Sequence, residues 1–140
     1  MEIPNKVKNF VWRTCREALP TKANLSRQRI VPDGVCDRCK RHSEDNSHAL
    51  FFCSDVQVVW ALDPNWQWLL AMQGQTAREI FMCALEEDKD ATPLAFTSWA
   101  IWNRRNQIWV GQTACPLNQI LNISKERKIE FQLLHPSNLK

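Results

Sequence analysis

Three cysteines and a histidine lie close together in the first half of the chain, in the pattern Cys-x2-Cys-x8-His-x4-Cys. These residues are Cys36, Cys39, His48 and Cys53. Zinc is commonly held in a tetrahedron of four thiolate or imidazole ligands, and a Cys-x2-Cys turn supplies two thiolates from one tight loop. The pattern therefore predicts a closed Cys3His zinc site, and it requires the chain to fold so that these distant side chains meet.

Other interpretations of the same residues fit less well. His42 is an alternative fourth ligand, but only two residues separate it from Cys39, so His48 is preferred. A redox Cys-x-x-Cys is expected in a βαβ setting, and the deaminase pattern H-x-E…P-C-x-x-C is absent here. Because the four ligands leave no open coordination position, we expect the zinc to be structural rather than catalytic.

Composition indicates a helical, intracellular protein of about one domain. The 140 residues include only three glycines and no tyrosine, which favours helices over a β-sandwich or barrel. We find no apolar run long enough to span a bilayer, and the first ten residues lack the apolar segment of a signal peptide. In a reducing compartment, disulfides are not expected. The remaining cysteines are predicted to be small buried hydrophobes, and they are Cys15, Cys83 and Cys115.

Apolar residues recur with a helical period along much of the chain. The expected helices cover residues 5–19, 22–30, 48–62, 77–85, 93–110 and 117–134. Trp12 is placed on the apolar side of the first helix, and Thr21 and Thr76 are expected to cap the second and fourth. Pro93 and Gly111 bracket the fifth helix, in which Arg104 is expected to be exposed and Trp102 to be buried.

These patterns predict a mainly α fold, in which a small helical domain with a zinc-stapled Cys3His loop is followed by further amphipathic helices. We expect a zinc-binding module over residues 1–62 and a helical linker with an acidic end over 63–91. A C-terminal helical segment over 92–140 is expected to pack on the module or on a partner.

Charge is distributed unevenly. Residues 1–42 carry a formal charge of +6, residues 43–90 carry −7, and residues 91–140 carry +4. A basic front end of this kind is typical of a polyanion-binding surface, and we expect the acidic stretch to face away from it. Trp12, Phe51 and Phe52 are candidates for stacking on bases. The candidate nucleic-acid contacts are Lys6, Arg13, Arg16, Arg27, Arg29, Arg38, Lys40 and Arg41, with Lys22 beside them.

The first part of the chain also resembles a known family. The stretches "KVKNFVWR" and "LPTKANL", then the four zinc ligands, Glu44 and Trp60, follow in the order found in the zinc-binding domain of plant non-LTR retrotransposon reverse transcriptases. The likeness covers roughly residues 3–60. The spacing is also similar to a retroviral zinc knuckle with a longer middle loop. Further on, "SWAIWNRRNQIW" resembles a "WxIWxxRN" helix that precedes an RNase H domain in such polyproteins.

The resemblance implies a non-catalytic zinc module of a nucleic-acid-handling protein. The absence of tyrosine rules out a Tyr-x-Asp-Asp polymerase motif in this chain. We expect RNA or single-stranded DNA as partner, a nuclear location, and no membrane or small-molecule substrate. The alternative is a protein-interaction or self-association module with purely structural zinc. That alternative is suggested by the tryptophans of the fifth helix, Trp99, Trp102 and Trp109.

Overall fold

The computed structural model describes residues 2–87 and 91–135, and this part of the chain contains helices and no strand. An isolated antiparallel bridge joins Val35 to Ser43. The mainly α fold is thereby confirmed. The helices are α1 Asn5–Cys15, α2 Lys22–Arg27, η1 His48–Phe52, α3 Ser54–Ala61, η2 Pro64–Trp66, α4 Gln67–Leu70, α5 Ala77–Glu86, α6 Ala91–Trp109, η3 Leu117–Gln119 and α7 Ile120–Leu134.

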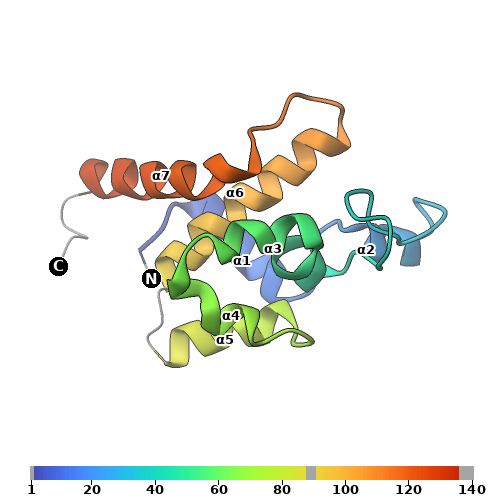
Figure 1. Cartoon of the computed structure of the whole chain (residues 1–140), viewed down its shortest axis with the longest axis horizontal. Helices are drawn as coiled ribbons and strands as arrows, with labels where there is room; N and C mark the ends of the chain where they lie inside the picture. Colours follow the sequence, from blue (N-terminus) through green and yellow to red (C-terminus); the bar gives the residue numbers. More distant parts are fainter. Residues whose placement is uncertain (1, 88–90, 136–140) are drawn as a thin grey trace.

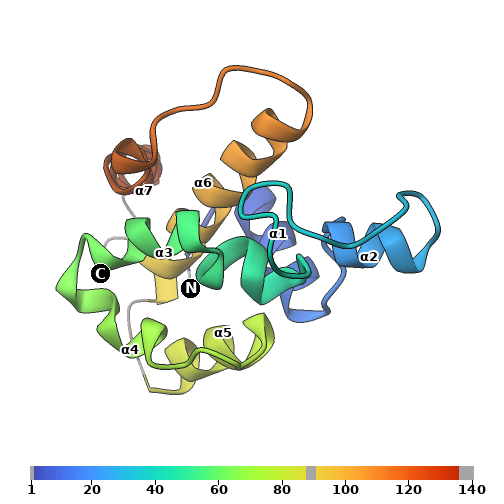
Figure 2. The ribbon, with the colours of Figure 1, turned by 45° about the vertical axis from the view of Figure 1, so that its right-hand side comes forward.

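The long helix α6 forms the centre of the molecule. It contacts α7 along much of its length and also packs against α1, α5 and η1. In both ribbon views α7 lies on one side of α6 and the α4–α5 pair lies on the opposite side (Figures 1 and 2). The short α2 and the loop that carries the first two cysteines project at one end of the molecule.

Aromatic rings from separate helices meet in the core. The ring of Phe51 lies 5.6 Å from that of Trp60 and 6.2 Å from that of Phe81, and Trp60 meets Trp66 edge to face at 4.9 Å. Residues from all three predicted segments belong to the same hydrophobic cluster, including Val7, Phe81 and Ile101. The division at residues 62 and 91 stays a prediction.

Helix α1 differs from its sequence prediction in two respects. It ends at Cys15, before Pro20, because Glu17 adopts a left-handed backbone (φ 54°) that lets the Ala18 N–H reach the carbonyl of Arg13 at 2.8 Å. The sequence places Trp12 on the apolar side of the helix, but Trp12 is 60% exposed. The apolar arc of α1 is wider than the strip that α5 and α6 cover, and Trp12 lies outside that strip.

The helix expected over 48–62 is interrupted at Cys53. A π-helical turn precedes this residue and α3 follows it, because Cys53 has extended backbone angles (φ −56°, ψ 138°). The caps predicted at Thr21 and Thr76 are confirmed, with each hydroxyl accepting an N–H three residues on. Part of the expected acidic linker, residues 88–90, lies outside the described residues, as does the end of the tail, 136–140.

Helix α6 begins two residues before Pro93. It ends, as predicted, just before Gly111, which has a left-handed backbone (φ 75°). There the N–H of Gln112 donates to the carbonyl of Gln107 at 2.8 Å. Trp102 is buried, whereas Trp109 is 42% exposed. Arg104 is half-buried and donates to the carbonyl of Cys115 at 2.7 Å. None of the helices in the described part of the chain combines the length and apolar character needed to cross a membrane.

Candidate metal centre

The four residues of the Cys-x2-Cys-x8-His-x4-Cys pattern come together in one group. Their ligand atoms all lie within 4.8 Å of one another. The Sγ atoms of Cys36 and Cys53 are 3.9 Å apart, and the Cys39 Sγ lies 3.4 Å from the His48 Nε2. Tetrahedral zinc, with bonds of about 2.3 Å to sulfur and about 2.0 Å to nitrogen, places two sulfurs about 3.8 Å apart and a sulfur and a nitrogen about 3.5 Å apart. The group therefore fits a zinc ion.

The first two ligands are placed by a tight turn. The N–H of Lys40 donates to the carbonyl of Cys36 at 2.8 Å, and the N–H of Cys36 donates to the carbonyl of His42 at 2.8 Å. Lys40 takes a left-handed backbone (φ 58°), which reverses the chain directly after Cys39. The turn thus brings both thiols to the same side of the loop.

The other two ligands are placed by the π-helical turn η1. The carboxylate of Asp45 accepts the N–H of His48 at 2.8 Å and so starts the turn. The N–H of Cys53 then donates to the carbonyl of His48 at 2.9 Å, a five-residue separation that brings the two ligands together. His42 is exposed and lies outside the ligand group, although its ring is 5.8 Å from that of His48.

The ligand side chains influence one another's protonation. Hydrogen bonding with the Cys53 thiol is the main factor that lowers the pKa of Cys36, to about 2, and the same bond raises the pKa of Cys53. Burial lowers the pKa of His48, but its hydrogen bonds and proximity to Cys36 and Cys39 outweigh burial and raise it. A zinc ion requires thiolates and neutral imidazole, so its binding releases protons and strengthens as pH rises.

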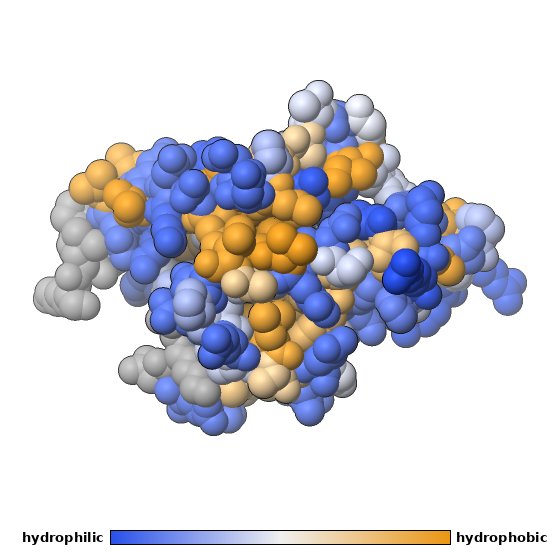
Figure 3. All heavy atoms as spheres, in the orientation of Figure 1, coloured by the Kyte–Doolittle hydropathy of each residue, from blue (hydrophilic) through white to orange (hydrophobic). Residues whose placement is uncertain are grey.

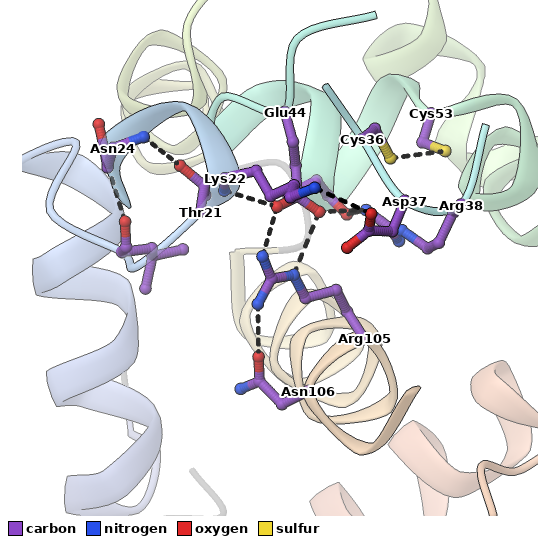
Figure 4. Close-up of polar contacts among 12 residues, drawn as sticks. Thr21, Lys22, Asn24, Cys36, Asp37, Arg38, Glu44, Cys53, Arg105 and Asn106 are labelled. Atoms are coloured by element: carbon purple, nitrogen blue, oxygen red, sulfur yellow. Dashed lines mark hydrogen bonds and ion pairs between the residues drawn. The ribbon is translucent and has the colours of Figure 1, made fainter. Parts of the chain in front are cut away.

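A buried carboxylate, Glu44, lies in the loop between Cys39 and His48 (Figure 4). Glu44 is 2% exposed, and it accepts hydrogen bonds from the backbone N–H of Lys22 at 2.8 Å and from the Arg105 Nε at 3.1 Å. The Nη2 atoms of Arg105 and Arg38 also contact this carboxylate. We call Glu44, Arg38 and Arg105 the Glu44 cluster. In the sequence, Glu44 stands out only as part of the family resemblance, and no local pattern points to Arg105, its partner 61 positions away.

Arg38, a predicted phosphate contact, is buried and bound within the protein. Its side chain is 5% exposed, and its Nη2 donates to the carbonyl of Ala49 at 3.0 Å besides contacting Glu44 at 3.4 Å. Lys22 is also engaged, since its Nζ donates to Asp37 at 3.0 Å and its side chain is 15% exposed. These two cations neutralise carboxylates of the protein itself.

The remaining candidate cations are exposed on several surfaces. Arg13 and Arg27 line a groove of about 420 Å³ between the end of α1 and α2, and the Arg16 guanidinium lies 4.8 Å from the centroid of the Trp12 ring. At the other end of α1, Lys6 lies 4.9 Å from the ring of Trp99. The other exposed candidates are Arg29, Lys40 and Arg41.

Two further expectations are corrected. Phe51 is fully buried in the core and Phe52 is half-buried, so Phe51 is excluded from base stacking. The acidic stretch does not face entirely away from the basic groove. Glu17 lines that groove, and its pKa is raised mainly by burial and further by the charges of Asp45 and Glu79. Asp45 and Glu79 both belong to the acidic stretch, so part of that stretch lies near the groove.

These features define a helical protein with a Cys3His site of structural type. Residues 1–60 match the family model for zinc-binding in reverse transcriptase, which confirms the resemblance over this part of the chain. The match names a zinc-binding domain and no catalytic domain, and the ligand group described above fits that metal. No curated protein and no solved structure matches the chain. The plant and retrotransposon origins stay predictions.

Proposed function

We propose that the protein is a non-catalytic module in which a structural zinc holds the loop to the helices, and which binds RNA or single-stranded DNA through α1. Cys36, Cys39, His48 and Cys53 would hold the zinc. Once four protein ligands fill the tetrahedron, the ion has no position for a substrate, so its contribution is to folding. The predicted nuclear location stays a prediction.

The observation that carries the nucleic-acid proposal is the exposure of Trp12. A large aromatic ring that is 60% exposed on a helix is available for stacking, and bases stack on such rings with little regard to sequence. The Arg16 guanidinium, 4.8 Å from this ring, adds a positive charge where a phosphate would follow the stacked base.

Phosphates along the strand would meet further cations next to Trp12. Arg13 is the following residue on α1 and is exposed, and Arg27 lines the same groove as Arg13. We call Trp12, Arg13, Arg16 and Arg27 the α1 surface. Each neutralised phosphate releases counterions, so binding at this surface would weaken as salt concentration increases. Glu17 in the groove opposes part of this attraction.

The test compares two variants that each lose two positive charges. Arg13→Gln/Arg16→Gln removes charge from the α1 surface, and Lys125→Gln/Lys128→Gln removes it from α7. In fluorescence anisotropy with a labelled 20-nucleotide RNA, we expect the first variant to bind several-fold more weakly and to reduce the salt slope by about two units. The α7 variant is expected to bind like the wild type. Trp12→Ala should weaken binding at every sequence by about 1–3 kcal/mol.

Equal affinity in the wild type and both variants would contradict the proposed surface. If the zinc-loaded wild type binds RNA and single-stranded DNA no better than an unrelated protein of the same net charge, the nucleic-acid proposal is wrong.

A protein-interaction module is the second candidate function. The tryptophans of α6 support it less than expected, because Trp102 is buried within the chain and Trp99 is half-buried. A different surface favours it, since hydrophobic side chains gather over α3 on the face shown in Figure 3. Val58 of α3 and Leu62, the residue directly after α3, are 54% and 53% exposed. Dimerisation in sedimentation experiments that is lost in Val58→Asp would favour this candidate.

A further inference from the structure

We propose that Glu44 and Arg105 are positioning residues for the metal centre, so that docking of α6 and zinc binding strengthen each other. The inference rests on the zinc-holding role of the four ligands and not on nucleic-acid binding. It extends the site beyond the matched residues 1–60, because Arg105 comes from α6.

The Glu44 cluster connects the two halves of the ligand group. In the sequence, Arg38 stands between Cys36 and Cys39. Its Nη2 donates at 3.0 Å to the carbonyl of Ala49, the residue directly after His48. The same Nη2 contacts Glu44 at 3.4 Å. Movement of Glu44 would therefore be transmitted to the Cys-x2-Cys turn and to the start of η1.

The position of Arg105 is fixed by α6. Its guanidinium contacts two tryptophan rings and lies 4.7 Å from the centroid of Trp102 and 4.9 Å from that of Trp109. Its Nη1 also donates to the Asn106 side chain at 3.1 Å, and the residue is 6% exposed. A cation held in this way presents both Nε and Nη2 to the Glu44 carboxylate in a fixed direction (Figure 4).

The backbone of Glu44 connects the same loop to α2 and to the residues that precede Cys36. Its N–H donates to the carbonyl of Gly34 at 2.8 Å, and its carbonyl accepts the N–H of Ala23 at 3.0 Å. Without Arg105, the buried Glu44 carboxylate would keep only Arg38 and the backbone N–H of Lys22 as partners. A buried charge that loses a partner is strongly unfavourable. The loop would relax toward solvent and the ligands would lose their preset geometry.

Groups that orient metal ligands without touching the metal typically change metal affinity by about 10–100-fold. We therefore expect Arg105→Met, which keeps an unbranched apolar stem but removes the guanidinium with its charge and donors, to weaken zinc binding about tenfold or more. The adjacent Arg104→Met is the matched control, because it removes the same charge from the same helix but Arg104 donates to Cys115 rather than to the loop. Its zinc affinity should equal that of the wild type.

The measurement is competition between the full-length chain and a chromophoric zinc chelator, with circular dichroism to compare folding. If Arg105→Met is not folded, Arg105→Lys and Glu44→Gln take its place, and both should weaken zinc binding while α-helical content is retained. A zinc dissociation constant within twofold of the wild type in a folded Arg105 or Glu44 variant overturns the inference. A wild type that takes up no zinc would instead contradict the metal centre itself.

Coupling must act in both directions. Removal of zinc from the wild type should speed hydrogen exchange in the part of α6 that carries Arg105, residues 100–109, more than in α5. In Arg105→Met this extra acceleration should disappear, because the connection between loop and helix is already broken. Equal acceleration of both helices in the wild type would show that zinc stabilises the fold generally and would contradict a specific role for Arg105.

Discussion

Left-handed backbone at non-glycine residues recurs at turns in and before the metal loop, by which we mean residues 34–53. Glu17, Arg29 and Lys40 have φ values of 54°, 60° and 58°. Such a conformation costs roughly 1–2 kcal/mol for a residue with a Cβ. At Glu17 and Arg29 it is maintained by hydrogen bonds that end helices; after Arg29, for example, the Ile30 N–H reaches the carbonyl of Leu25 at 2.9 Å. At Lys40 it is maintained by the turn in which the Lys40 N–H donates to the carbonyl of Cys36.

Arg29→Gly should therefore stabilise the protein. Arg29 is exposed and follows the end of α2, so glycine there removes the left-handed strain without loss of packing. We expect a gain of about 0.5–1 kcal/mol in the free energy of unfolding, measured with urea on the zinc-loaded chain. Gln28→Gly is the control, because φ at Gln28 is −86° and glycine offers no relief there. A loss of stability in Arg29→Gly would contradict this account.

At the scale of elements, α6 acquires its stability from the helices around it. Its apolar residues face α1, α5, α7 and η1 together, so that the helix is surrounded along its first half and exposed near its end. Trp102 occupies the transition between these parts. It is 7% exposed and supports the guanidinium of Arg105.

Truncation of Trp102 should be costly and truncation of Trp12 should not. Trp102→Ala removes a buried ring, so we expect a loss of about 3 kcal/mol or more in the free energy of unfolding. Trp12→Ala removes a ring that is 60% exposed, and a surface change of this kind typically costs within about 0.5 kcal/mol. Denaturation of both variants checks the contrast, and equal losses would show that the burial of Trp102 does not govern stability.

At the scale of the whole molecule, one hydrophobic cluster includes residues of α1, α3, α4, α5, α6 and α7. The metal loop is attached to this cluster at Cys36 and Cys53, which are both fully buried. Further attachment comes from Asn46, whose side chain donates to the carbonyl of Thr14 at 3.3 Å.

Chelation of zinc should therefore weaken the entire fold while loosening the loop most. Free energy of metal binding is folding free energy when the site is not preformed in the unfolded chain. We expect a lower thermal midpoint after verified zinc removal and the fastest hydrogen exchange over residues 20–60. An unchanged midpoint and unchanged exchange in that segment would mean that the metal does not support the fold. Restoration of the midpoint by added zinc controls for damage during chelation.

Local sequence patterns predict the elements that depend on neighbouring residues. Helical periodicity identified the long helices, local hydroxyls identified the caps at Thr21 and Thr76, and Gly111 identified the end of α6. The ligand group was predictable for the same reason, because its spacing reflects the geometry of one ion.

Which charged and aromatic side chains are exposed for binding depends on long-range contacts in the fold. Arg38 and Arg41 are both basic residues of the same loop, yet Arg38 is buried against Glu44 while Arg41 is exposed. Trp12 and Trp102 both lie on helices with apolar neighbours, but only Trp102 is buried. Burial depends on contacts between residues far apart in the chain, such as Glu44 with Arg105, and local patterns carry no information about such contacts.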